Sequence, residues 1–340
     1  MPSGVSRGWL SIAAALLGLL VGAVGPSRAG EPVRLNAAYN AFVAANGSLW
    51  VAKEAGLFEK HGLALQLLLI ESGTTAVQAL LAGEVPLVHM ASAAAIQSRV
   101  AGSDLLLISG VENLLPYSLI AQKAITRPEQ LRGKRLAISR FGSASDFAAR
   151  LILERLGLQP ERDVAILQVG GTSTRFAAVQ RGTVESTVIT LEFGHLARKL
   201  GFSVLAEALR LQIEFIQNGL VTTPGFLQRQ PEAARRFLRG YVEGIFYFKA
   251  NREASIQALG KYLRIQDAET LQEMYAYFAQ TFPPVPYPPV KAVQTVLDRL
   301  AERDPRARAV RAERLVDHAP LRELETSGFI RTLSDRYGVR

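Results

Sequence analysis

The stretch "GTTAVQALLAGEVPLVHM" (residues 73–90) decides the fold, and a second stretch, "GTSTRFAAVQRGTVESTVIT" (171–190), repeats its pattern. In both, a glycine and hydroxyl residues open an amphipathic helix, a second glycine ends it, and a β-branched strand follows. Helices that alternate with strands in this way predict a mostly parallel sheet with both faces covered. The repetition predicts two α/β lobes in one chain.

The alternating pattern extends outward from both stretches. In the first lobe we expect strands at 33–39, 63–70, 85–90 and 104–111, and helices at 48–62, 74–83 and 92–102. After residues 116–122 the pattern restarts, with strands at 134–139, 164–169, 185–190 and 202–207. Helices are expected at 145–156 and 172–181, and a further helix follows the third of these strands and ends at residue 200. From residue 219 the pattern becomes helical, at 231–250, 252–263 and 267–280, before the proline-rich connector 281–290 and further helix.

The first 29 residues have the features of a Sec-type signal peptide. Arg7 precedes an apolar segment that is too short to span a bilayer, and the small residues Ser27 and Ala29 precede a plausible cleavage point. The chain has no cysteine, which excludes a lipoprotein anchor, disulfides and thiolate chemistry. We therefore expect an exported periplasmic protein without a lipid anchor.

The net charge of +9 does not indicate a nucleic-acid partner. Loss of Arg7 and Arg28 with the signal peptide would lower it to +7, and the densest basic run, 299–314, is interleaved with acidic residues. Such a run is typical of a solvated helix face, and the excess gives an anionic ligand only a mild long-range attraction.

The motifs of common enzymes are absent. The four histidines lie singly without metal-ligand spacing, Ser143 lacks the second glycine of a nucleophile elbow, and no phosphate or dinucleotide loop occurs. His89, at the end of a strand, is interpreted as a core or hinge residue. We expect no catalytic residue, metal or cofactor.

Five junctions from strand to helix share one property: small or hydroxyl residues at the helix start. They are "ESGTT" (71–75), "MASAA" (90–94), "RFGSAS" (140–145), "GGTST" (170–174) and "TLEFG" (190–194). Free amides at helix N-termini attract anions, and open α/β sheets bind ligands at this edge. Helix capping by serine and threonine is the alternative interpretation of each junction, and Asp146 can complete a capping box with Ser143.

Several stretches together resemble the nitrate, sulfonate and taurine class of periplasmic solute-binding proteins of ABC importers, a group akin to thiamine-pyrimidine-precursor binding proteins. They are "LWVAKEAGLFEKHGL", "SGTTAVQALLAGEV", "LPYSLIA", "LRGKRLAISRFGSASDFAARLILERLGL", "GLVTTPGFL" and "FLRGYVEGIFYFKANREASI". The resemblance implies an α/β fold of the two-lobed, type II clamshell kind, with a helical C-terminal extension on lobe one. It implies that residues 30–116 and 219–340 form lobe one and 117–218 form lobe two, with hinges at "PYSL" and "GLVTT".

The same resemblance implies the ligand contacts. These are Asn40, Phe42, Asn46, Ser72, Thr74 and Ser92 in lobe one, and Phe141, Gly142, Ser143, Gly171, Thr190 and Glu192 in lobe two. For the two phenylalanines, a place in the core is the alternative. Glu192 either pairs with an amine of a nitrogenous ligand or is an exposed first-turn residue, and Arg140 either reaches an anion or faces solvent.

The function that we expect is therefore capture of a small polar or anionic solute, such as a sulfonate or an aromatic or nitrogenous compound. The protein would be a monomer that delivers the solute to an ABC permease and its ATPase. A ligand-sensing subunit for a membrane receptor and an enzyme similar to a pyrimidine-precursor synthase are the alternatives.

Overall fold

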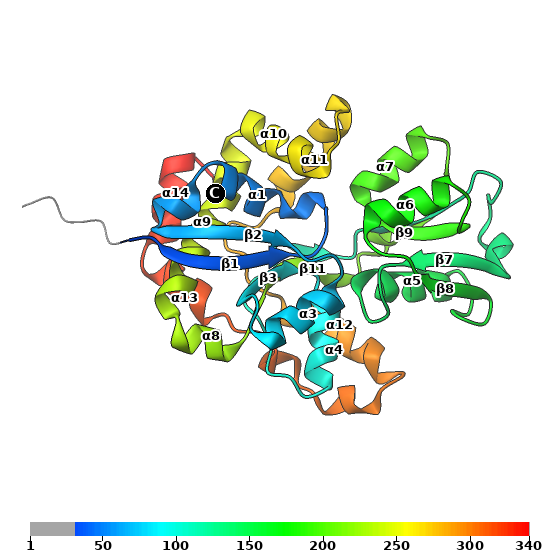
Figure 1. Cartoon of the computed structure of the whole chain (residues 1–340), viewed down its shortest axis with the longest axis horizontal. Coiled ribbons are helices and arrows are strands. Elements are labelled where there is room, and N and C mark those ends of the chain that lie inside the picture. The colour runs from blue at the N-terminus through cyan, green and yellow to red at the C-terminus, as the bar shows by residue number, and fades with distance from the viewer. Residues whose placement is uncertain (1–30, 340) are drawn as a thin grey trace, which may run out of the picture. The chain divides into compact units, whose positions relative to one another are not determined.

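Two β-sheets organise the computed structural model, which describes residues 31–339 (Figure 1). The first sheet has the order β2-β1-β3-β11-β4, with β5 paired to β11, and the second has the order β10-β6-β9-β7-β8. The strands of the first sheet are β1 (Val33–Tyr39), β2 (Leu63–Leu69), β3 (Leu87–Met90), β4 (Leu106–Leu107), β5 (Glu112–Leu114) and β11 (Glu214–Thr222). Those of the second are β6 (Tyr117–Ala121), β7 (Lys134–Ile138), β8 (Val164–Gln168), β9 (Ser186–Thr190) and β10 (Ser203–Glu207).

One strand in each sheet runs against the others. β11 is antiparallel to β3, β4 and β5, and β6 is antiparallel to β9 and β10, whereas β1 pairs in parallel with β2 and β3, and β7 with β8 and β9. The prediction of an α/β fold with two mostly parallel sheets flanked by helices is confirmed. The two reversed strands are the segments by which the chain enters the second sheet and returns to the first.

Alternate residues of β1 face two different helical layers. Leu35, Ala37 and Tyr39 pack with α1 (Gly47–Glu54), α2 (Leu57–Lys60), α9 (Pro231–Ala250) and α10 (Arg252–Leu263). Ala38 packs in the other cluster with α3 (Gly73–Ala82), α4 (Ser92–Val100) and α12 (Val290–Ala301). The remaining helices of this half are α8 (Pro224–Arg229), α11 (Ala268–Thr281), α13 (Ala319–Thr326) and α14 (Phe329–Tyr337).

The second sheet is also covered on both faces. α5 (Ala144–Arg155) lies on one face and α6 (Thr172–Gln180) and α7 (Leu191–Lys199) on the other (Figure 1). We call the first sheet with its helices the first half and the second sheet with its helices the second half. The cluster that contains α5 continues into α4 and α12, so one apolar core joins the two halves. Residues 32–340 accordingly form one compact unit.

The structure corrects three sequence-based predictions. The helix at 48–62 is two helices, because Gly56 has a φ of 67° in the left-handed region, which ends α1 and begins α2. The strand at 104–111 is reduced to Leu106–Leu107. The chain does not become helical at 219, because β11 runs to Thr222 and so covers the first four residues of "GLVTT".

The other elements for which limits were predicted end within two residues of those limits. No helix within residues 31–339 has the length and apolar character needed to cross a membrane. The predicted signal peptide lies outside the described residues.

Candidate functional site

A small cavity lies where the carboxyl ends of strands from both sheets meet. Its volume is about 30 Å³, and four of the five predicted junctions line it. The lining residues are Asn40, Ala41, Glu71, Ser72, Gly73, Ala91, Tyr117, Ser139, Ser143, Ala144, Ser145, Gly171, Thr172, Arg175 and Gln217. This is the edge at which open α/β sheets bind ligands. We call this cavity the cleft.

Three hydroxyl groups gather at the start of α5. Ser139 Oγ donates to Ser143 Oγ at 2.8 Å, and Ser145 Oγ lies 3.0 Å from each of the other two. Ser143 also caps α5, because its Oγ accepts a hydrogen bond from the Asp146 amide at 3.4 Å. The Asp146 carboxylate accepts from the Gly142 amide at 2.9 Å, one residue earlier than in a capping box. Ser143 therefore both caps α5 and lines the cleft.

Arg175 supplies a buried positive charge to the cleft. Its side chain projects from the first turn of α6, and the residue is 2% exposed. The guanidinium donates to the carbonyl oxygens of Gly170 at 2.7 Å and Val188 at 3.2 Å, and to the hydroxyls of Thr187 and Thr172 at 3.3 and 3.4 Å. All four acceptors are neutral. Burial lowers the pKa of Arg175 to about 10, so the guanidinium stays charged at neutral pH.

Glu71 brings a carboxylate from the first half to the second. A Cβ on Gly171, the N-cap residue of α6, would overlap the Glu71 carboxylate, so the two residues are in close contact. The negative charge of Glu71 also partly offsets the lowering of the Arg175 pKa. An acidic side chain therefore faces a helix N-terminus, which is the position that an anionic group prefers.

Two further polar groups face the cleft from the first half. Gln217 on β11 is buried, and its Oε1 has no hydrogen-bond partner among residues 31–339, while its Nε2 donates to the Tyr117 hydroxyl at 3.4 Å. Ser72 lies at a φ of 82°, and its Oγ is 3.0 Å from Thr74 Oγ1. The cleft thus offers hydrogen-bonding groups on both sides and a buried cation on one.

Five other predicted contacts do not line the cleft: Phe42, Asn46, Thr74, Ser92 and Thr190. Asn46 is buried and bonded to His89 Nδ1 at 2.5 Å and to the Ala41 carbonyl at 2.7 Å. Phe42 packs edge-on against Tyr39, Ser92 is buried at the start of α4, and Thr190 is the buried N-cap residue of α7.

Phe141 and Gly142 line a different cavity, and Arg140 is exposed. Glu192 belongs to α7, but its side chain lies outside the part that the structure describes. Both alternatives for Glu192 stay open.

His89 is a core histidine, as predicted. It is fully buried, its Nε2 lies 2.9 Å from the Tyr241 hydroxyl, and burial lowers its pKa to about 3. A neutral His89 is hydrogen-bonded to Asn46, whose amide in turn donates to the carbonyl of the cleft residue Ala41. Across residues 31–339, no group of three or more His, Asp or Glu side chains is placed to bind a metal ion.

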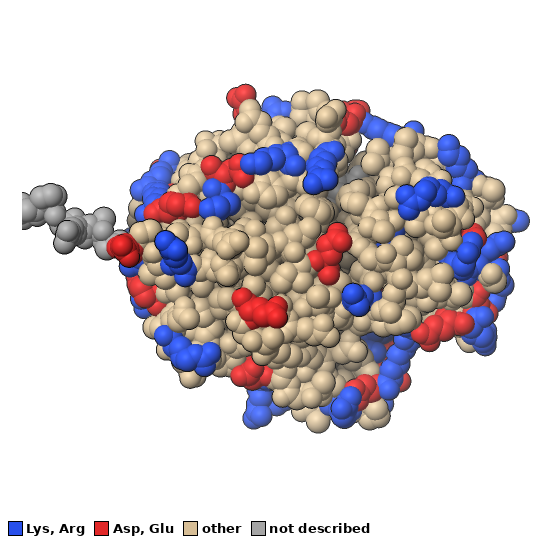
Figure 2. All heavy atoms as spheres, in the orientation of Figure 1, with Lys and Arg blue, Asp and Glu red and all other residues tan. Residues whose placement is uncertain are grey.

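Arg175 and Gln217 are the cleft residues that the sequence interpretation missed. Arg175 lies on the buried stripe of α6 with Thr172 and Val179, and a charged residue on such a stripe is a usable signal. Gln217 had no comparable signal, because its strand was not predicted. Figure 2 shows basic and acidic side chains interspersed over the drawn face, which agrees with the absence of a single basic patch in the sequence.

The comparison with known families identifies the chain. The sequence profile described as NMT1/THI5 like matches residues 46–255, which is more than half of the chain. The chain belongs to the NMT1/THI5-like family. A relative from Brucella abortus (strain 2308), named "Putative binding protein", is 22% identical over 220 residues, 64% of this chain and 68% of the relative.

Solved structures share the fold of this family member. The alkanesulfonate-binding protein SsuA from Xanthomonas axonopodis pv. citri, bound to MOPS, matches with a TM-score of 0.70 and 20% identity, over 84% of this chain and 99% of SsuA. The periplasmic nitrate-binding protein NrtA from Synechocystis PCC 6803 matches with a TM-score of 0.68 and 14% identity, over 87% and 89%. The fold is therefore that of the periplasmic binding proteins.

Proposed function

We propose that this protein captures a small anionic solute in the cleft, as the periplasmic substrate-binding component of an ABC importer. The observation that carries the proposal is Arg175, a buried guanidinium that lines the cleft and has only neutral hydrogen-bond acceptors. A buried cation is most stable beside an anion, and charge-assisted hydrogen bonds are the stronger ones. The sulfonate and nitrate ligands in the names of SsuA and NrtA support the same chemistry.

The cleft volume implies that the ligand enters an opened form. About 30 Å³ is room for a water molecule rather than for an organic solute. Residues 30–116 with 219–340 would form one lobe and 117–218 the other, and the lobes would separate and close about the segments that join the sheets. Contacts from both halves to one ligand favour the closed form.

The proposed route places the protein in the periplasm. Its N-terminal 29 residues have the sequence features of a signal peptide, and the structural relative NrtA is named as a periplasmic protein. The partners would be a permease and its ATPase, and the protein would act as a monomer.

A ligand screen on a cleft-blocking variant tests the proposal. The melting temperature of the mature protein is measured with alkanesulfonates, aromatic carboxylates, nitrogen heterocycles and nitrate. At 100 times its Kd, a ligand adds about 2.7 kcal/mol of stability, so a true ligand gives a clear shift. Gly171→Leu should abolish that shift, because the new side chain enters the space beside Glu71.

Gly225→Leu is the matched control, because there the added side chain meets only the flexible end of Arg229. Its shift should equal that of the wild type. An equal shift in Gly171→Leu would place the ligand elsewhere, and no shift with any of the compounds would refute an anionic solute.

A further inference from the structure

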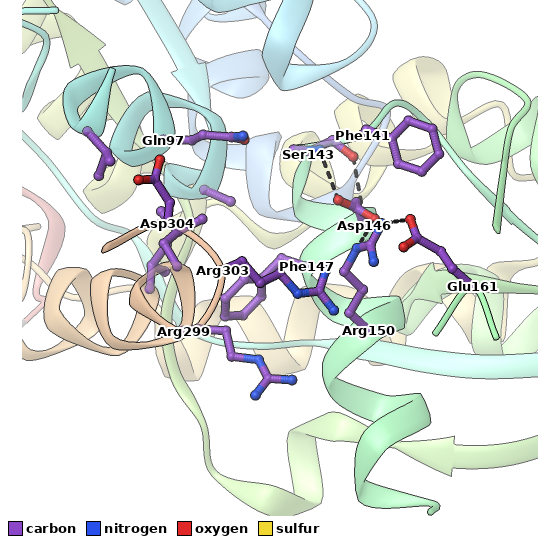
Figure 3. A pocket seen from close by; sticks show the side chains of 15 residues that line it. Gln97, Phe141, Ser143, Asp146, Phe147, Arg150, Glu161, Arg299, Arg303 and Asp304 are labelled. Atoms are coloured by element: carbon purple, nitrogen blue, oxygen red, sulfur yellow. Dashed lines mark hydrogen bonds and ion pairs between the residues drawn. The ribbon is translucent and has the colours of Figure 1, made fainter. Parts of the chain in front are cut away.

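A second and larger cavity adjoins the α5 N-terminus (Figure 3). Its volume is about 330 Å³, within the range of small-molecule pockets. α4 and the end of α12 form one wall, from the first half, and the first two turns of α5 form the other, from the second half. Ser143 lines both cavities. We call this second cavity the α5–α12 pocket.

Two arginines approach each other across the pocket. Figure 3 shows Arg303 and Arg150 extending toward one another from opposite walls. Arg150 pairs with Asp146 at 2.6 Å and Glu161 at 2.8 Å, but its Nη1 is buried and has no hydrogen-bond partner among residues 31–339.

Arg303 is weakly neutralised. Its carboxylate contact in the described chain is Glu154 at 3.5 Å, whereas Arg299 pairs with both Glu154 and Glu302. Burial and the positive charges of Arg150 and Arg299 lower the pKa of Arg303. Asp304, at the rim, is engaged by Arg306 at 2.7 Å. The pocket therefore holds a buried Arg150 Nη1 without a hydrogen-bond partner among the described residues and a pair of guanidinium groups that repel each other.

The pocket also has an apolar part. Val100, Phe147, Val296 and Leu300 line it, and Phe141 stands at its rim with 45% of its surface exposed. The Phe141 ring lies 5.8 Å from the Arg150 guanidinium. An exposed aromatic ring beside a cation and an apolar wall suits the body of an amphiphilic molecule.

We propose that the α5–α12 pocket is a second binding site, for a small amphiphilic organic anion with a carboxylate head. The head would lie between Arg150 Nη1 and Arg303, where one anion satisfies the free donor and relieves the repulsion between the guanidinium groups. The hydrocarbon body would lie against Val296, Leu300 and Phe147. Because the two walls belong to different halves, binding of an anion in this pocket would favour the relative position of the halves in which both walls contact it.

Calorimetric titration of the full mature chain with octanoate tests the site, with 1-octanol as the uncharged probe of equal chain length. Octanoate should bind saturably and 1-octanol much more weakly. Arg303→Gln should weaken octanoate at least about tenfold, since a charge-assisted hydrogen bond is lost. Arg308→Gln removes an equal charge from an exposed residue outside the pocket and should leave the affinity unchanged.

Two more variants separate this site from the cleft and from simple charge loss. Leu300→Trp fills the pocket without removing a charge and should also abolish octanoate binding, while Gly171→Leu blocks the cleft and should leave it intact. Thermal melts of each variant confirm that it is folded. Unsaturable octanoate binding, equal affinity in Arg303→Gln and wild type, or loss in Gly171→Leu alone would overturn the proposal.

Discussion

Two buried charges, Glu243 on α9 and Arg175 on α6, are accommodated in opposite ways. The Glu243 carboxylate is fully buried and meets positive and hydroxyl donors from two other helices. These are Lys60, His61 at 2.6 Å, Arg336 at 3.0 Å and Tyr337 at 2.7 Å. Arg175, equally buried, donates only to neutral oxygens. The first arrangement is complete within the chain, and the second leaves room for an anion from outside.

The difference assigns a structural role to the buried charge of Glu243 and a ligand-binding role to that of Arg175. Burial by itself raises the pKa of Glu243, but the hydrogen bonds from His61, Lys60 and Tyr337 outweigh it and hold that pKa at about 2. The carboxylate thereby fastens α2 and the C-terminal α14 to α9. All hydrogen bonds that the Arg175 guanidinium gives within the described chain go to the second half, and its interaction with the first half is the attraction to the Glu71 charge across the cleft.

The largest expected effect is the loss of the Glu243 charge. Glu243→Gln should lower the free energy of unfolding by about 3–5 kcal/mol, because several charge-assisted hydrogen bonds converge on this buried carboxylate and weaken when its charge is removed. Urea denaturation of the mature protein measures this change. Glu253→Gln, at an exposed position at the start of α10, is the matched control and should change the stability by less than about 0.5 kcal/mol. A similar small change in stability for both variants would contradict the structural role of Glu243.

Acid should reproduce part of that loss. Because folding lowers the pKa of Glu243 from 4.5 to about 2, its contribution to stability is complete above pH 4.5 and disappears as the pH falls toward 2. The wild type should therefore lose more stability than Glu243→Gln across this interval, as measured by urea midpoints at matched pH values. Parallel pH profiles of the two proteins would contradict the assignment.

Arg175→Gln should have a smaller effect on stability and a selective effect on binding. We expect the free energy of unfolding to fall by about 1–3 kcal/mol, because the carbonyls of Gly170 and Val188 lose their donors. The loss is limited because no carboxylate within residues 31–339 accepts a hydrogen bond from Arg175. Thermal stabilisation by the anions found in the screen should disappear in this variant and partly persist in Arg175→Lys. If Arg175→Gln destabilised the protein as much as Glu243→Gln, or kept its anion response, the contrast would fail.

Much of the fold was predictable because its signals are local. The glycines after α3 and α6 and the hydroxyl residues before α5 mark helix limits in the sequence. β11 was not predictable in this way. Its residues are buried on both faces yet include Gln217 and Asn218, so the segment shows neither alternation nor a continuous apolar run.

The candidate site likewise contains residues that were predictable from local sequence and residues that were not. The junctions at 71–75, 90–94, 140–145 and 170–174 were predictable because helix N-termini carry local sequence signals, and all four reach the cleft. The role of Arg175 depends on which strands surround its helix, and that of Gln217 on an unpredicted strand. These are tertiary properties, for which a single sequence holds no direct pattern.

The contact between Gly142 and Gln97 has a mechanical consequence. Gly142 lies at a φ of 77°, and a Cβ there would overlap the Gln97 amide, which projects from α4 in the opposite half. The glycine leaves room for the Gln97 amide to lie against the α5 N-terminus. In a variant with alanine at this position, the flexible Gln97 side chain would have to turn away and the positive φ would strain the new residue, so this bridge between the two halves would loosen.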